Sequence, residues 1–465
     1  MQYDVAIVGG GPAGAALAWL LAQRAWRVLL LDDGRHRAAA PRETLLYAAR
    51  AGLQRSGLWD LVAAVAVPDP FRHGAIWGRD ELVWREEANA GLLLARGVFD
   101  AALRRAVAAR GVDLLVGGQL GRLPRRGEPV RYQDAHGGLH ELRAQFWVVA
   151  TGRRPRPELL ALQQVQRGPE TAALSVVGRH AAADRWAVVE AVPHGWWWWI
   201  GDGKGGGAAT LLCDARELAR LGSRRLVDAA RAAARGPVAG LTTPRLVHAT
   251  RATARVLRTS DDVLLLGDAA ATIDPLASQG VEKALAAAEH AAAVLQTARE
   301  QPAWWPQLRE QHARWERGLF AAHAATAQQF LQQEQRFVDA PFWRARLAAP
   351  AGSGLSAAAP APQEPLQVSP QVQEALVLQR QGERFVQVEG ARHDGNGDTL
   401  SHLGFVPVVP VLRAFATPRS LAAAVAAAGA DPRLFVLPPH AVQQAALVLH
   451  RYGWLVTAAN APTDR

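Results

Sequence analysis

Apolar residues in the first part of the chain follow the order strand, helix, strand. Tyr3 to Val8 is a short apolar run that predicts a buried strand, and Val28 to Leu31 is a second run of the same kind. Between them, Pro12 to Ala25 is typical of a helix with proline at its first position. Gly9 to Gly11 breaks the first run where the strand must turn into the helix. This order predicts a β-α-β unit and therefore a parallel sheet.

Helical and buried-strand patterns continue to residue 347. Further helices are expected at Arg42 to Leu61, within Leu92 to Gly111, at Val281 to Ala298, and through most of Trp304 to Leu347. Further buried strands are expected at Gln145 to Ala150 and Val263 to Leu266.

Between Pro157 and Leu246 the pattern changes to longer strands. Trp186 to Val192 and Trp196 to Ile200 fit antiparallel strands, and Gly201 to Gly207 is a glycine-rich turn. This stretch therefore predicts a separate antiparallel sheet inserted into the α/β fold.

The C-terminal part has signals of its own. Residues 348–370 are rich in Ala, Pro, Gly and Ser and read as a linker. Within 371–465, Thr417 and Pro418 open an alanine-rich helix that Gly429 closes, and a second helix near Pro439 to Tyr452 stops at Gly453. We expect a small, mainly helical accessory domain over 371–465.

Composition excludes several classes of protein. The chain has 465 residues, 49% of them hydrophobic and 20% charged, which is typical of a globular protein and excludes a disordered or collagen-like chain. A single cysteine, Cys213, excludes an internal disulfide, a zinc ribbon and an iron–sulfur centre, and favours a reducing compartment such as the cytoplasm. Val5 to Ala22 is uncharged, but its glycines and the missing basic flank argue against a signal peptide or membrane span.

The charge balance is basic. The 52 Lys and Arg residues outnumber 42 acidic residues, for a formal charge of +10, and only Lys204 and Lys283 are lysines. A compositional bias of the source genome is the simpler explanation, and attraction of an acidic partner or anionic cofactor is the alternative. No run of five basic residues occurs, so nucleic acid is not favoured.

A phosphate-binding turn is predicted where the first strand meets the first helix. Gly9 permits the tight turn, Gly11 lets the backbone approach a pyrophosphate, and Gly14 lets helix and strand pack closely. The helix N-terminus offers free N–H groups to phosphate. Asp32, at the end of the second strand, has the spacing of a carboxylate that binds a ribose hydroxyl. A glycine turn made for packing alone would not explain Asp32.

A second motif follows the strand at Val263 to Leu266. Asp268 lies at the strand end, where a carboxylate accepts hydrogen bonds from a ribityl chain, although an ordinary loop aspartate is the simpler interpretation of such a residue alone. Asp274, Pro275 and Leu276 then lead to Gly280, where a helix begins and can offer N–H groups to a flavin ring.

Together these two motifs resemble those of FAD-dependent monooxygenases of the para-hydroxybenzoate hydroxylase type and of the related flavin-dependent halogenases. The resemblance covers residues 1–347 and implies an α/β fold, with a Rossmann-like FAD-binding domain and an inserted antiparallel sheet that forms the substrate domain. It implies FAD as cofactor, with Asp268 on the ribityl chain and with Arg42 and Arg96 near the FAD. The expected parts are the FAD domain at 1–65, 92–155 and 247–300, the substrate sheet at 66–91 and 156–246, and helices at 301–347.

Other residues separate hydroxylation from halogenation. Trp196-Trp197-Trp198-Trp199-Ile200 contains the Trp-x-Trp-x-Ile pattern of halogenases, and Pro341-Phe342-Trp343-Arg344 is similar to the end of their flavin region. Tryptophan halogenases also use an early lysine and a glutamate. This chain has no lysine before Lys204 and has Ala277 where the glutamate is expected. Hydroxylation is therefore the preferred hypothesis, and halogenation is the alternative.

Within the superfamily, the chain resembles the flavoprotein monooxygenases of tryptophylquinone cofactor biogenesis. That resemblance implies hydroxylation of an electron-rich ring, a tryptophan side chain in a peptide or protein, through a flavin C4a-hydroperoxide. A geranylgeranyl-reductase-like flavoprotein and a non-catalytic flavin-binding scaffold stay open as alternatives. The accessory domain is expected to help recognise a macromolecular substrate.

The four consecutive tryptophans supply the candidate substrate pocket. In a strand, Trp196 and Trp198 face one side and Trp197 and Trp199 the other. Packing in the core is the simpler role for each, but one pair can wall an aromatic pocket. His194, at the strand entrance, is a candidate proton donor or acceptor, against the simpler reading of a turn histidine.

The source of electrons is left open by the sequence. No second Rossmann motif for NAD(P)H is found, and Ala150-Thr151-Gly152-Arg153 has threonine where related hydroxylases carry the aspartate of an Asp-Gly motif. A separate flavin reductase is therefore a candidate partner.

Overall fold

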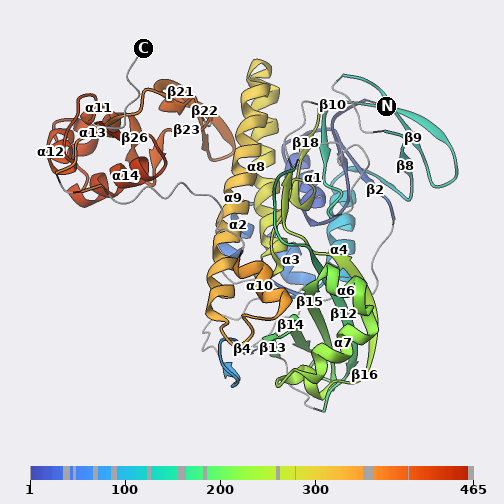
Figure 1. The fold of residues 1–465 in the computed structure, drawn as a ribbon. Coiled ribbons are helices and arrows are strands. Elements are labelled where there is room, and N and C mark those ends of the chain that lie inside the picture. The colour runs from blue at the N-terminus through green and yellow to red at the C-terminus, as the bar shows by residue number, and fades with distance from the viewer. Residues whose placement is uncertain are drawn as a thin grey trace. The chain divides into compact units, whose positions relative to one another are not determined.

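The computed structural model describes residues 2–34, 42–45, 49–65, 72–84, 92–122, 127–153, 164–181, 186–257, 262–277, 279–348, 360–361, 363–395 and 397–458. The chain divides into two compact units (Figure 1). The first comprises Met1–Arg299 and Arg309–Pro350, and the second Glu300–Leu308 and Ala351–Arg465.

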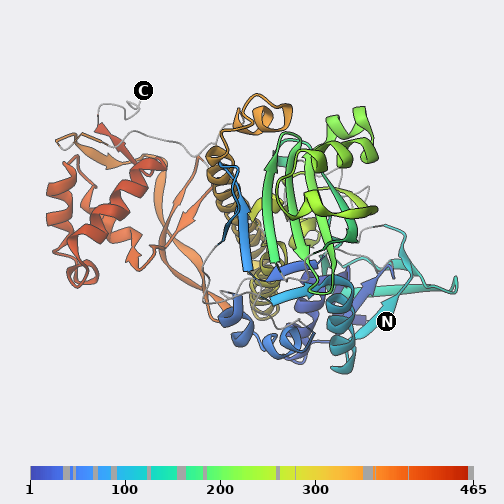
Figure 2. The ribbon, with the colours of Figure 1, turned by 90° about the horizontal axis from the view of Figure 1, so that it is seen from below.

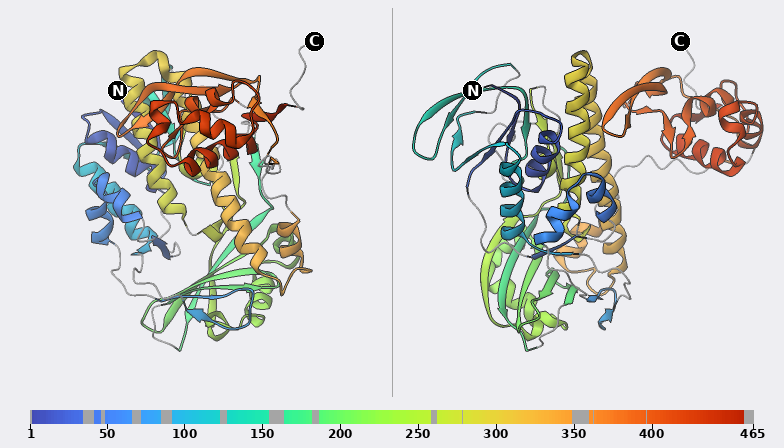
Figure 3. Two further views of the ribbon diagram at one scale, coloured as in Figure 1. Left: turned by 90° about the vertical axis from the view of Figure 1, so that its left-hand side faces the viewer. Right: turned by 180° about the vertical axis from the view of Figure 1, so that it is seen from behind.

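A mainly parallel sheet organises the first unit. Its parallel strands run in the order β7-β2-β1-β10, with β18 beside β10, and β9 and β8 extend it antiparallel. The bounds are β1 Gln2–Val8, β2 Val28–Asp32, β7 Asp113–Val116, β8 Gln119–Leu120, β9 Val130–Gln133, β10 Leu139–Val149 and β18 Leu264–Leu265. Helices α1 (Pro12–Ala22) and α4 (Arg96–Ala109) pack beside these strands (Figure 3). The predicted β-α-β unit and Rossmann-like core are confirmed.

A second, antiparallel sheet lies at the other end of the first unit (Figures 1 and 2). Its order is β16-β12-β15-β14-β13-β4-β5, antiparallel except for the parallel pair β13 and β4. The bounds are β4 Arg72–Ile76, β5 Val83–Trp84, β12 Thr171–Arg179, β13 Trp186–Val192, β14 Gly195–Gly201, β15 Gly206–Asp214 and β16 Thr242–Arg251. Helices α6 (Ala215–Leu221) and α7 (Ser223–Ala232) and the short helix η2 (Pro237–Gly240) follow β15 and cover one face of the sheet.

Two smaller sheets complete the strands of this unit. One pairs β3 (Arg42–Leu45) with β6 (Leu92–Ala95), and the other has the order β11-β17-β19. The latter strands are Gln164–Arg167, Arg255–Leu257 and Ala271–Thr272. The predicted helix from Arg42 to Leu61 is therefore wrong at its start: a strand precedes α2 (Arg50–Arg55) and α3 (Trp59–Val65). Pairing with a segment about fifty residues away overrides the local helical preference.

Three α-helices follow the segment that contains Asp268 and Asp274. They are α8 (Gly280–Glu300), α9 (Trp305–Gln333) and α10 (Pro341–Leu347), with the short helix η5 (Pro302–Trp304) between the first two. Helices α8 and α9 run side by side (Figure 1). The contact of His290 with His312 joins them within the first unit.

The second unit has its own core and mixes helices with strands. Its helices are α11 Val408–Ala414, α12 Leu421–Ala428, α13 Pro432–Phe435 and α14 Pro439–Arg451. Its strands are β20 Leu366–Val368, β21 Val372–Gln381, β22 Arg384–His393, β23 Thr399–Leu400, β24 His402–Leu403, β25 Val406–Pro407 and β26 Leu455–Thr457. The two predicted helices are present, the first beginning at Leu421 with Ser420 as its cap rather than at Thr417.

Two expectations for this region need correction. The predicted linker over 348–370 ends early, because Leu366–Val368 pairs with β26. The hairpin of β21 and β22 is a further strand pair that the sequence pattern does not predict. Among the residues that the structure describes, no helix combines the length and apolar character needed to cross a membrane.

Candidate functional site

A cavity of about 710 Å³ lies within the first unit and has two walls. The carboxyl ends of β1, β2, β10 and β18 form one wall, through residues such as Gly9, Asp32, Thr151 and Leu266. One face of the antiparallel sheet forms the other. Ligands of open parallel sheets bind at such strand ends, and the volume is within the range of cofactor and substrate sites.

The glycine turn after β1 is shaped for close approach to a ligand. Gly9 has a φ of +116°, and a Cβ there would lie 2.3 Å from the carbonyl oxygen of Ala150. A Cβ on Gly14 would lie 2.0 Å from the carbonyl oxygen of Gly9, so this glycine serves packing and does not line the cavity. A Cβ on Gly11 would meet no atom within 4 Å, and this residue lines the cavity immediately before α1. The turn thus leaves room for a phosphate group at a helix N-terminus.

Asp32 lies beside this turn at the end of β2. Its Oδ1 accepts the backbone N–H of Gly34 at 2.8 Å, and its Oδ2 lies 3.8 Å from Nη1 of Arg104. Arg104, on α4, is buried and also donates to the carbonyl of Gly10 at 3.3 Å. No sequence motif marks Arg104, because α4 reaches the turn only through tertiary packing.

Asp268 lies in the short helix η3 (Gly267–Ala269) after β18 and lines the same cavity. Its Oδ2 accepts a hydrogen bond from Nε of Arg153 at 2.9 Å. Nearby, the hydroxyl of Thr151 is buried and has no hydrogen-bond partner among the described residues. A buried hydroxyl without a partner is costly unless a ligand satisfies it. This hydroxyl, the open space at Gly11 and the carboxylate of Asp268 therefore fit a dinucleotide.

The turn at Asp268 is supported from beneath by side chains of α8 and α9. Burial lowers the pKa of His312 to about 4, so its ring is neutral, and its Nε2–H donates to the carbonyl of Leu265 at 2.9 Å. Nδ1 of His312 is then an acceptor, and Nδ1 of His290, 3.1 Å away, is the donor. One turn further along α9, Glu316 pairs with Lys283 of α8.

The remaining predicted cofactor residues lie around the same cavity. Pro275, at the start of the short helix η4 (Pro275–Ala277), and Gly280, at the start of α8, both line it. Arg96 also lines it, with its guanidinium bound by Glu43 at 2.8 Å and by Asp100 at 3.2 Å. The side chain of Arg42 lies outside the described residues. Except for Gly14 and Arg42, the structure thus brings the predicted cofactor residues to one cavity; their contacts with FAD stay a prediction.

The sheet wall of the cavity consists of two rows of cross-strand neighbours. The first row runs across β14, β15, β12 and β16 as Trp198, Thr210, Ser175 and His248. The second row runs across the same strands as Trp196, Leu212, Ala173 and Thr250. All eight residues line the cavity. The wall therefore has an aromatic side on β14 and a polar side on β12 and β16.

The other face of this sheet is core. Trp197 and Trp199 are buried there with Leu174, Val176 and residues of α7, and Nε1 of Trp197 donates to the carbonyl of Ala230 at 3.2 Å. The predicted alternation of the four tryptophans is therefore observed, with Trp196 and Trp198 at the cavity and Trp197 and Trp199 away from it.

His194 is not at the cavity. It lies in the turn between β13 and β14, and its Nδ1 is 2.9 Å from Oε1 of Glu217 at the start of α6. Its place in the fold gives no geometric support to the predicted role in proton transfer. His248 of β16 is the only histidine among the described residues that line the cavity.

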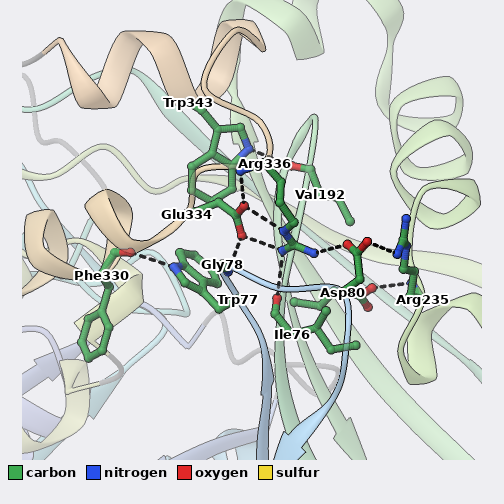
Figure 4. Close-up of polar contacts among 11 residues, drawn as sticks. Ile76, Trp77, Gly78, Asp80, Val192, Arg235, Phe330, Glu334, Arg336 and Trp343 are labelled. Carbon is green, nitrogen blue, oxygen red and sulfur yellow. Dashed lines mark hydrogen bonds and ion pairs between the residues drawn. The ribbon is translucent and has the colours of Figure 1, made fainter.

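A polar network holds the segment after β4, which contacts the aromatic side of the wall (Figure 4). Nε1 of Trp77, after β4, donates to the carbonyl of Phe330 on α9 at 2.7 Å, and the next residue, Gly78, donates to Glu334 at 2.8 Å. The ring of Trp77 packs edge-on against Trp196 and Trp343, with centroids 6.5 and 5.3 Å away. Arg336 and Glu334 close the network. Trp196 thus contacts a tryptophan that is held by hydrogen bonds.

The fold and the cavity together define a flavin-dependent oxidoreductase that binds FAD. The chain belongs to the family described as FAD binding domain, whose model matches residues 2–301. This match and the structural similarities below confirm the superfamily, the cofactor and the fold class predicted from the sequence.

Among solved structures, the chain is similar to the peptidyl tryptophan dihydroxylase QhpG, which is described as essential for tryptophylquinone cofactor biogenesis. The two are 25% identical, the similarity covers 97% of this chain and 100% of that chain, and the TM-score is 0.72. The flavin-dependent halogenase CmlS has the same fold, with 18% identity, coverage of 99% and 97%, and a TM-score of 0.73.

A curated relative is the digeranylgeranylglycerophospholipid reductase 2 of Methanopyrus kandleri. It is 29% identical over 159 residues, which are 34% of this chain and 39% of the relative. The matched segment thus spans about two fifths of the relative's length.

Proposed function

We propose that the protein is an FAD-dependent monooxygenase that hydroxylates a tryptophan side chain of a peptide or protein during quinone cofactor biogenesis. The single observation that carries this proposal is the position of Trp196 and Trp198 on the wall of the cavity that also contains the FAD-binding motifs. The similarity to QhpG over nearly the whole of both chains supports it.

The net reaction combines an aromatic C–H bond, O₂, two electrons and two protons to give C–OH and water. Reduced FAD supplies the two electrons and the activation of O₂ when it is bound. The chain itself holds the cofactor through the turns at Gly11 and Asp268, and its aromatic wall holds the substrate ring and excludes water.

Aromatic contact is suited to an indole substrate. Trp196 is buried and Trp198 is half-buried, and both belong to a central strand that is paired on both sides. Rigid indole rings favour stacked or edge-on contacts with another aromatic ring. Beside them, the hydroxyls of Ser175 and Thr210 bind one another at 2.9 Å, so each has a hydrogen-bond partner when the apolar part of a substrate covers them.

The positions of the two lysines disfavour the halogenase alternative. Lys283 is fully buried between α8 and α9, and Lys204 lies exposed in the turn between β14 and β15. Neither is among the described residues that line the cavity. Among the described residues, no lysine therefore places an ammonium group beside the cavity, as halogenation of this kind requires.

The C-terminal unit is proposed to contribute to recognition of the macromolecular substrate. It has a separate core of helices α11, α12 and α14 and strand β20. Because β20 pairs with β26, a clean truncation must remove residues from 360 onward rather than only those after Pro370. The truncated protein is expected to retain FAD and activity on a short peptide but to lose turnover of a protein substrate; equal rates on both substrates would contradict this role.

The proposed activity is tested by mass spectrometry of tryptophan-containing peptides and proteins. The holoenzyme is incubated with O₂, bromide and a reductant, either NAD(P)H directly or a separate flavin reductase with NAD(P)H. A product heavier by one or two oxygen atoms supports hydroxylation, and an ¹⁸O₂ label in the product confirms its source. A bromine isotope pattern would support halogenation, and an unchanged substrate with both reductants would refute the proposed activity.

A further inference from the structure

His248 is placed at the cavity by the register of the antiparallel sheet. It lies directly opposite Ser175 of β12. In the same row, Ser175 lies opposite Thr210 of β15, and Thr210 lies opposite Trp198 of β14. Directly opposed side chains of neighbouring strands lie about 5 Å apart at Cβ. The imidazole therefore stands three strands away from the ring of Trp198, on the same side of the sheet.

A bulge in β16 sets this orientation. Leu246 is opposite Val176 and His248 is opposite Ser175, so Val247 is an extra residue in the ladder. Val176 belongs to the core on the other face of the sheet, whereas Ser175 lines the cavity. Without the extra residue, Leu246 and His248 would share a face. The bulge thus allows β16 to present His248 to the cavity, and bulges recur beside active sites.

The wall between His248 and Trp198 is suited to an indole lying flat. Its apolar part is Trp196, Trp198 and Leu212, and its polar edge is His248 and Thr250. The hydroxyls of Ser175 and Thr210, between them, are already bound to each other. A neutral imidazole has one ring nitrogen that accepts a hydrogen bond, and an indole has one N–H that donates.

We propose that the imidazole of His248 accepts the hydrogen bond of the substrate's ring N–H and so selects N–H heteroaromatic rings over rings that lack this donor. The inference rests on the proposed function. Adding oxygen to the ring makes the ring transiently electron-poor, and an acceptor on the N–H stabilises the positive charge that develops there. His248 therefore contributes to rate as well as to binding.

The expected discrimination follows from the energetics of polar groups in a closed site. A site that accepts a substrate N–H rejects an analogue that lacks it, because the acceptor of the site is then left without a partner. Because one neutral hydrogen bond distinguishes the two, we expect kcat/KM for a substrate with the ring N–H to exceed that for the analogue without it about 10- to 100-fold.

The test compares tryptophan with 1-methyltryptophan at the same position of one peptide. The wild-type holoenzyme, His248→Gln, His248→Leu and the matched control His140→Gln are each measured for kcat/KM and, with oxidised flavin, for peptide affinity by the change in flavin absorbance. His140 lies on the hairpin of β9 and β10, half-exposed and bound to Asp134 at 2.7 Å, and does not line the cavity. Equal FAD content of all four proteins shows that they fold.

The wild type and His140→Gln are expected to prefer tryptophan by at least 10-fold, in rate and in affinity. His248→Leu should lose this preference, and His248→Gln should retain part of it because its amide oxygen is an acceptor. A preference of His248→Leu equal to that of the wild type would overturn the inference while the proposed function stands. If the wild type binds neither peptide and hydroxylates neither, the proposed function itself fails.

Discussion

The ammonium group of Lys283 and the carboxylate of Glu316 lie 3.3 Å apart in the interior, where their side chains are 0% and 2% exposed. The pair joins α8 to α9 directly behind the turn that carries Asp268. Burial raises the pKa of Glu316, and the charge of Lys283 opposes that shift. Since both side chains are buried, each charge depends on the other for its compensation.

Replacing Glu316 with Leu is therefore expected to destabilise the protein by about 3–5 kcal/mol, because an ammonium group is left in the interior without its counter-charge. The double variant Lys283→Met, Glu316→Leu removes both charges and is expected to regain most of this loss. The measurement is denaturant unfolding followed by tryptophan fluorescence. A double variant as unstable as the single one would show that the two charges do not depend on each other.

The buried His312 predicts loss of stability in mild acid. Its pKa is lowered by burial from 6.5 to about 4, so the unfolded chain binds this proton at a higher pH than the folded protein does. The stabilisation is therefore fully present above pH 6.5 and is lost as the pH falls through 4, by roughly 3 kcal/mol in total.

His312→Gln tests this expectation, because glutamine can still donate to the carbonyl of Leu265 but does not titrate. Unfolding midpoints measured between pH 7 and pH 4 should fall less steeply in this variant than in the wild type. The half-exposed control His140→Gln, far from α8 and α9 in the sequence, should keep a slope close to that of the wild type. Equal slopes for all three proteins would mean that His312 does not resist protonation.

The open space at Gly11 predicts a variant that folds but binds FAD poorly. A valine side chain at this position meets no protein atom nearby at its Cβ and projects into the space assigned to phosphate. We expect Gly11→Val to lower FAD affinity at least tenfold, measured by titration of the apoprotein with FAD. The control Gly318→Ala, on the exposed side of α9, should leave FAD affinity unchanged and stabilise the helix by up to about 1 kcal/mol.

Arg336 is expected to stabilise the loop that holds Trp77. Its guanidinium donates to both oxygens of Glu334, at 2.9 and 2.6 Å, and the side chain of Glu334 is 0% exposed (Figure 4). Arg336→Leu leaves this carboxylate without its cation and should cost about 1–3 kcal/mol, seen as a lower thermal midpoint. Asp80→Asn, which alters the half-exposed end of the same network, should have a much smaller effect. A reversed order of the two effects would contradict the role given to Glu334.

Much of the site was predictable because its signals are local. Gly9, Gly11 and Asp32 lie within one β-α-β unit, where spacing alone fixes their positions, and Asp268 follows a recognisable strand. The alternation of Trp196 to Trp199 between the two faces of the sheet follows from the two-residue period of a strand.

Other parts depend on contacts that spacing does not reveal. Arg104 and Arg153 reach Asp32 and Asp268 from distant segments. His194 lies near the aromatic run in sequence, but the turn directs it to Glu217. His248 was missed because the predicted sheet ended at Leu246 and because a bulge interrupts the alternation of β16.

The position of β16 at one border of its sheet has a consequence for how new specificities can arise. Among the strands that the structure describes, β16 has a neighbour on one side only, whereas the tryptophan strand β14 is enclosed by two. Substitutions of His248 and Thr250 therefore alter the side chains offered to an incoming molecule, while Trp196, Trp198 and the turns at Gly11 and Asp268 are expected to keep their shape. Directed evolution toward other ring systems should find its most productive mutations on this outer strand.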